Sequence, residues 1–148
     1  MASTKHGPRA QYPFHCITSV QLRFSDIDML GHLNNNAYLQ IYDLGKNDYF
    51  AKVRPGYVKW SRPPLMIVNL NCSFLAQTRF HEPVQVLTQV ETMGDKSFIM
   101  MQQVVNAETG EVKSECQSVM VYFGDDGLPA RVTDDWRNDI ATYEQREL

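Results

Sequence analysis

The sequence predicts an α+β domain in which a curled antiparallel sheet covers a long central helix. One observation is the order of its patterns, in which a strand-like run and a helix-like run precede four consecutive strand-like runs. A second is that short polar turns join these last runs, which favours antiparallel hairpins. A third is Gly45, which lies on the apolar side of the predicted helix and indicates that another backbone approaches there.

The first strand is expected within residues 17–24, where apolar and polar residues alternate and one face would be buried. The helix is expected from about residue 36 to residue 53. Its apolar positions recur at spacings of three and four, at Tyr38, Ile41, Tyr42, Gly45 and Tyr49. Tyr38 and Tyr42 are therefore expected to be core residues.

The second half of the chain is expected to begin with an ordered, non-helical crossover over residues 54–64, which contains Trp60 and could cover a pocket. A short C-terminal helix should follow the cap residues Thr133 and Asp134 and pack one face. The four strands between them are predicted at residues 65–75, 84–93, 98–106 and 112–123.

Size and composition are those of one self-sufficient domain. The chain has 148 residues, of which 43% are hydrophobic, so residues 1–148 are expected to form a single domain with residues 1–14 as a flexible N-terminal extension. The net charge of −3 and the lack of clustered basic residues argue against nucleic acid as a partner.

The cysteines indicate neither a disulfide framework nor a zinc site, because Cys16, Cys72 and Cys116 are far apart and odd in number. Each is expected to pack as a small apolar group. The sequence also has no signal-like or membrane-spanning apolar run, so we expect a cytoplasmic protein.

The most informative segment is the motif DxDxxGHxNNxxY, which runs from Asp26 to Tyr38. It lies between the end of a strand and the start of a helix, where the positive end of the helix dipole and free backbone N–H groups gather. With the element order, this motif resembles the hotdog fold. More specifically, over residues 20–123 the chain resembles the branch of 4-hydroxybenzoyl-CoA thioesterase and acyl-CoA thioester hydrolases.

The resemblance implies a thioesterase that cleaves an acyl-CoA, or an acyl-carrier-protein thioester, to a free acid and a thiol. It assigns the catalytic role to Asp28, as nucleophile or general base on the thioester carbonyl. A backbone N–H near Asn35 would polarise that carbonyl. The reaction needs no metal and no cofactor, since CoA is part of the substrate.

Other loop residues have two interpretations. Asp26 and Asp28 would point to the same side of an extended chain, but either could instead form a local turn or cap. His32 could act as a base or fix the loop by a hydrogen bond. Gly31 would let the loop turn under a ligand, and the Asn34, Asn35 and Asn36 amides could cap the helix or contact the ligand.

The family resemblance also implies a CoA site and an oligomer. Lys96, in the turn at residues 94–98, matches the position where relatives present basic residues to the CoA phosphates. Arg79 is a second candidate, with a structural salt bridge as its alternative. Asp43 is expected to be solvated or at an interface. Hotdog active sites form between protomers, so a homodimer is the minimal unit and a homotetramer is also compatible.

Two other functions stay open at this point. A hotdog hydratase or dehydratase would also act on a thioester, although that class resembles a DxNxxH arrangement and this chain has DxDxxGH. A non-catalytic acyl-CoA-binding protein could share the fold, because fold alone does not establish chemistry. The sequence sets neither the acyl chain nor the mode of attack.

Overall fold

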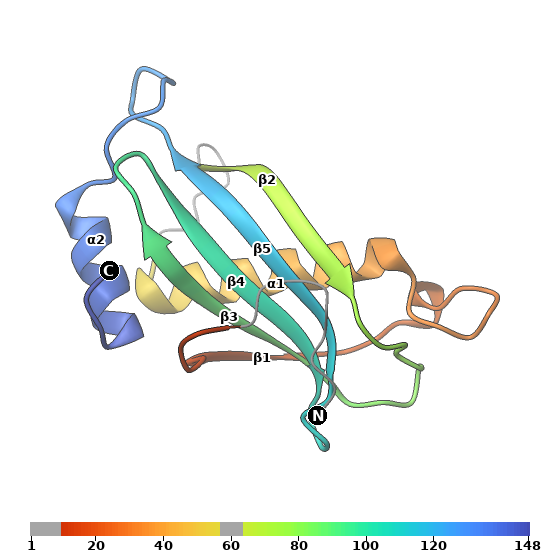
Figure 1. Cartoon of the computed structure of the whole chain (residues 1–148). Helices are drawn as coiled ribbons and strands as arrows, with labels where there is room; N and C mark the ends of the chain where they lie inside the picture. The colour runs from red at the N-terminus through yellow and green to blue at the C-terminus, as the bar shows by residue number, and fades with distance from the viewer. Residues whose placement is uncertain (1–9, 57–63) are drawn as a thin grey trace.

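The fold is α+β, as predicted: a five-stranded antiparallel sheet curls around the long helix α1, and the short helix α2 lies beside it (Figure 1). The computed structural model describes residues 10–56 and 64–148. The strand order in the sheet is β1-β3-β4-β5-β2, with every neighbouring pair antiparallel. The elements in chain order are β1 (Cys16–Val20), the 3-10 turn η1 (Phe24–Asp26), α1 (Asn35–Val53), β2 (Leu65–Phe74), β3 (Val84–Met93), β4 (Ser97–Asn106), β5 (Val112–Tyr122) and α2 (Asp134–Glu144).

Helix α1 packs closely against β3 and β4 at Gly45, which confirms the close sheet, although side chains of the sheet and not its backbone approach the glycine. A Cβ added to Gly45 would lie 2.8 Å from both Gln102 Nε2 and Thr88 Oγ1, and 3.0 Å from Val86 Cγ2. These distances are shorter than ordinary contacts, so a methyl group at this position would force the side chains of the sheet to shift. Gln102 also donates a hydrogen bond of 2.9 Å to the carbonyl of Tyr42 and ties the helix to β4.

The core is built from the apolar face of α1, and it divides into two clusters. Tyr38 and Tyr42 are buried as expected, in the cluster near the start of α1. Tyr49 and Phe50 belong to the other cluster, into which α2 packs Trp136 and Ile140. Helix α2 begins as predicted, with Thr133 as the N-cap that accepts a hydrogen bond from Trp136 N.

The first strand is shorter than predicted, because the chain turns after Val20. The backbone N–H of Arg23 donates to Asp26 Oδ2 at 2.8 Å, and its guanidinium donates to Asp26 Oδ1 at 2.9 Å. These bonds stabilise the 3-10 turn η1 in place of extended backbone. Leu22 is buried as expected, whereas Phe24 is 87% exposed and not part of a buried strand face.

Beyond Thr88, strand β3 has no strand partner on the side where β1 ends, within the described part of the chain, and groups from the C-terminus cover that edge. Arg146 donates to the carbonyls of Val90 and Glu91 at 2.6 and 2.8 Å, and Glu144 Oε1 accepts from Val90 N at 3.4 Å. The guanidinium of Arg146 also stacks on Tyr12, 3.6 Å from the ring centroid.

Two sequence predictions fall partly outside the described residues. Residues 1–9 of the predicted flexible extension are outside them, whereas Tyr12 lies against β3 and its carbonyl accepts a hydrogen bond from Gln89. Residues 57–63 of the predicted crossover, with Trp60, are also outside. Within the described part of the chain, none of the helices is long and apolar enough to span a membrane.

Candidate active site

Residues 27–34, here termed the acid loop, form a compact turn between η1 and α1. Ile27 and Leu33 pair as an antiparallel bridge. Within that bridge, Asp28 N donates to His32 O at 2.9 Å and Gly31 N donates to Asp28 O at 3.0 Å. Gly31 has φ +79°, so a residue with a side chain would strain the turn.

The two oxygens of the Asp28 carboxylate have different surroundings. Oδ1 accepts hydrogen bonds from the backbone N–H groups of Leu30 at 2.9 Å and His32 at 3.2 Å. Within residues 10–56 and 64–148, Oδ2 has no hydrogen-bond donor. The local turn role considered for this residue is therefore present, and it fixes one oxygen while the other remains open.

Asp28 lines a half-open surface pocket of about 340 Å³ whose other walls are apolar. The remaining lining residues are Phe24, Ile27, Met29 and Phe80. Phe24 and Phe80 contact each other edge to face, with centroids 6.4 Å apart. The carboxylate of Asp28 thus lies at the edge of a pocket whose apolar lining could bind an apolar group.

Asp26 has a structural role. It belongs to η1, so the extended backbone that would align it with Asp28 is absent. Hydrogen bonds and charge from Arg23 lower the pKa of Asp26. The carboxylate of Asp26 is thus committed to the turn that begins the acid loop.

The start of α1 offers one unpaired backbone donor beside the acid loop. Asn34 is the N-cap, and its Oδ1 accepts from Asn36 N at 3.0 Å, which confirms capping for that amide. Among the described residues, Asn35 N has no acceptor. Its position at the positive end of the helix makes it a candidate to stabilise negative charge.

The acid loop is braced by Thr78, a residue that the sequence did not single out. Thr78 O accepts from Leu33 N at 2.7 Å, and the hydroxyl groups of Thr78 and Tyr38 lie 2.8 Å apart. Both side chains are buried. Since Thr78 and Tyr38 are 40 positions apart, no local pattern could have predicted this contact.

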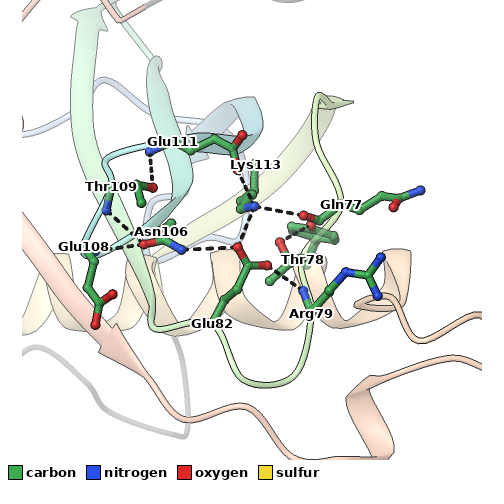
Figure 2. A network of polar contacts seen from close by, with 10 residues as sticks. Gln77, Thr78, Arg79, Glu82, Asn106, Glu108, Thr109, Glu111 and Lys113 are labelled. Carbon is green, nitrogen blue, oxygen red and sulfur yellow. Dashed lines mark hydrogen bonds and ion pairs between the residues drawn. The ribbon is translucent and has the colours of Figure 1, made fainter.

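A buried lysine holds the segment that carries Thr78 (Figure 2). Lys113 Nζ contacts Glu82 Oε1 at 2.9 Å and the carbonyl of Gln77 at 2.9 Å, and it also pairs with Glu111. Burial favours a raised pKa for Glu82, but the hydrogen bonds from Lys113 and other donors outweigh it, so the net shift is downward. No pattern in the sequence indicated this network.

The two candidate CoA residues lie in different places. Arg79 is exposed and adjoins Phe80 at the pocket; its backbone N–H donates to Glu82, and Figure 2 shows its guanidinium extending away from that carboxylate. Among the described residues it makes no ion pair. Lys96 lies in the β3–β4 turn, at the opposite end of the molecule from the acid loop in Figure 1.

For the other residues that the sequence placed at the site, the structure gives exposure and contacts but no role. His32 is half-buried and Asn35 and Asn36 are exposed at the helix start. Asp43 is exposed and lies 3.9 Å from Lys46 Nζ. Among residues 10–56 and 64–148, there is no group of three His, Cys, Asp or Glu residues that could hold a metal ion.

Comparison with known proteins assigns the chain to a known class of proteins. The profile of the thioesterase-like superfamily matches residues 22–141, so the chain belongs to that superfamily. This confirms the predicted fold, family and class of enzyme, a thioesterase. No curated protein matches the sequence significantly.

Solved structures of thioesterases share the fold over nearly the whole chain. A Thermus thermophilus thioesterase complexed with coenzyme A and zinc has 26% sequence identity and a TM-score of 0.82, covering 91% of this chain and 98% of its own. A predicted thioesterase from Bacillus stearothermophilus is 24% identical, with a TM-score of 0.79 and coverage of 89% and 98%. A 1,4-dihydroxy-2-naphthoyl-CoA thioesterase from Synechocystis is 16% identical, with a TM-score of 0.75 and coverage of 84% and 94%.

Proposed function

We propose that this thioesterase hydrolyses acyl-CoA thioesters and that Asp28 is its catalytic residue. The observation that carries the assignment is the carboxylate of Asp28, which has one oxygen fixed by two N–H groups and the other open at an apolar pocket. The CoA complex of the Thermus relative supports CoA as the carrier of the acyl group. Use of acyl-carrier-protein thioesters stays a prediction.

In the proposed reaction, Asp28 Oδ2 attacks the thioester carbonyl or removes a proton from the attacking water. The Asn35 N–H, unpaired within the described chain, stabilises the negative charge that develops on the carbonyl oxygen. Asp26 and Gly31 keep the acid loop in shape. His32 donates its backbone N–H to Asp28, and we assign no proton transfer to its ring.

The same proposal includes a homodimer, because exposed apolar groups lie along a sheet edge that has no partner strand among the described residues. Strand β2 ends the sheet, and its side chains Met66, Val68, Leu70 and Phe74 are each more than two-fifths exposed. An open edge with apolar side chains favours pairing with another strand. A partner would also bring its own Lys96 toward the acid loop, from which Lys96 is remote within one chain.

Release of free thiol from short, aromatic and long acyl-CoAs tests the activity. We expect hydrolysis of at least one class, with Arg79→Ala raising KM for CoA thioesters more than for the matching pantetheine thioesters, which lack the nucleotide phosphates. Binding of every acyl-CoA without thiol release would instead indicate a non-catalytic binding protein. Hydration of an enoyl-CoA without thiol release would indicate a hydratase.

Co-expression of Asp28→Asn with Lys96→Ala tests the shared site. If each site combines Asp28 of one protomer with Lys96 of the other, a mixed dimer keeps one intact site. Random pairing then restores about one quarter of the wild-type activity, above the average of the separate variants. Activity equal to the average of the two variants would show that Lys96 does not serve the partner's site.

A further inference from the structure

Two cysteine side chains face each other across neighbouring strands, on the side of the sheet covered by α1. Cys72 of β2 is the register partner of Cys116 of β5. Their Sγ atoms lie 2.7 Å apart, in hydrogen-bond contact, and both are free thiols. A disulfide requires an S–S distance of about 2.05 Å, so a sub-ångström movement would join them.

A buried cation lies near this thiol pair. Lys46 projects from α1, is only 4% exposed, and has Asp43 at 3.9 Å as its one ion pair among the described residues. Burial lowers the pKa of Lys46, and the two thiols and Asp43 oppose this shift. The charge of Lys46 in turn favours the thiolate form of both cysteines. Positive charge beside a cysteine is a usual feature of reactive thiols.

The two thiols differ in acidity. The hydrogen bond between Cys72 and Cys116, together with the field of Lys46, outweighs burial and lowers the pKa of Cys72. The same hydrogen bond and burial raise the pKa of Cys116. Cys72 is also the more exposed of the two. Cys72 thus has the properties of a nucleophilic cysteine, and Cys116 those of a resolving cysteine.

We propose that Cys72 and Cys116 form a redox modification site that peroxides convert to a cross-strand disulfide. The Cys72 thiolate attacks one oxygen of hydrogen peroxide and breaks the O–O bond, giving a sulfenic acid and hydroxide. The Cys116 thiolate, formed as that hydroxide takes its proton, then attacks the sulfenic sulfur. The S–S bond forms and the S–O bond breaks, releasing a second hydroxide that is protonated to water. Overall, two thiols and one peroxide give one disulfide and two waters.

The third cysteine provides a control within the same chain. Cys16 is buried in β1, where its Sγ lies 3.8 Å from an Asp48 carboxylate oxygen. Burial raises the pKa of Cys16, although Lys52 opposes the shift. The three cysteines of the sequence leave no further thiol to pair with it. It should therefore resist oxidation under conditions that join the other two.

Intact mass and peptide mapping of the full-length protein, before and after hydrogen peroxide, test the proposal. We expect the wild type and Cys16→Ser to lose two hydrogen atoms, to yield one crosslinked Cys72–Cys116 peptide, and to recover on addition of a thiol reductant. In Cys116→Ser, Cys72 should gain oxygen, because no resolving thiol remains. In Cys72→Ser, Cys116 should stay reduced.

Replacement of the cation tests why the pair reacts. Lys46→Met should slow crosslinking on the order of tenfold, through a smaller thiolate fraction at Cys72, while Lys46→Arg should retain the rate. Circular dichroism checks that each variant is folded. If the folded wild type gains oxygen at all three cysteines, or forms crosslinks only between chains, the proposal is wrong.

Discussion

The acid loop and the middle of α1 are adjacent in sequence but differ in what holds them in place. The acid loop keeps its shape by backbone hydrogen bonds, and Met29 at its tip is 98% exposed. The middle of α1 is fixed by close packing, with Gly45 against Gln102 and Thr88. Exposed side chains of the loop can therefore be replaced at little cost in stability. The packed face of the helix tolerates few substitutions.

The largest expected effect of a substitution is on activity and lies in the loop. Asp28→Asn keeps a hydrogen-bond acceptor for Leu30 N but removes the charge, so kcat should fall by about 10²-fold to 10⁴-fold. Tm should change little. Asp125→Asn, at an exposed carboxylate in the turn after β5, is the matched control for thiol-release assays. An active Asp28→Asn enzyme would contradict the assignment.

Lys113→Met would test whether the brace behind the loop contributes stability. The change leaves Glu82 without its cation, and breaking a buried pair costs about 3 kcal/mol. Urea unfolding measures the loss in the free energy of unfolding. The double variant Lys113→Met with Glu82→Gln should recover part of this stability, because Glu82 no longer leaves an uncompensated charge. If the double variant is only as stable as Lys113→Met, the two residues are not coupled.

Gly45→Ala would test the packed helix. The new methyl group would meet Gln102, Thr88 and Val86, and overpacking of this kind costs about 2 kcal/mol even though alanine favours helices. Thermal unfolding measures the loss. Asn47→Ala, at an exposed position two residues further along α1, should be neutral or slightly stabilising. A Gly45→Ala protein as stable as the wild type would show that the side chains of the sheet shift without cost to make room for the methyl group.

A smaller effect is expected from pH at Glu144, which joins α1 and α2. Burial raises the pKa of Glu144 to about 7, from 4.5, so the folded state binds a proton more readily than the unfolded chain. Stability should therefore fall as pH rises from 4.5 to about 7, by about 2 kcal/mol or less. Glu144→Gln should flatten this part of the profile. Denaturant unfolding across this range measures the slope, and an unchanged slope in Glu144→Gln would exclude Glu144 as its source.

The sequence predicted what periodicity and local motifs encode. Alternation and helical spacing predicted the strands after α1 and both helices, and Gly45 predicted the close sheet. The strand to Phe24 was wrong because the Arg23–Asp26 bonds form a local turn that alternation cannot indicate. For the site, the motif predicted Asp28 as the catalytic residue, which stays a prediction, and the capping role considered for the amides is confirmed for Asn34 alone. Thr78 and Lys113 were missed because their contacts join residues that are distant in sequence.

The guanidinium of Arg146 and the carboxylate of Glu144 have a consequence for assembly. They form hydrogen bonds with the carbonyl and the N–H of Val90 in β3, which another strand could otherwise use. The neighbouring edge strand β1 is only five residues long. Among the described residues, strand addition on that flank is thus limited to the five residues of β1, whereas β2 presents a ten-residue edge. In the homodimer proposed above, the two outer flanks would be the β1–β3 edges, where the C-terminal side chains cover part of β3, and this disfavours further growth by added strands.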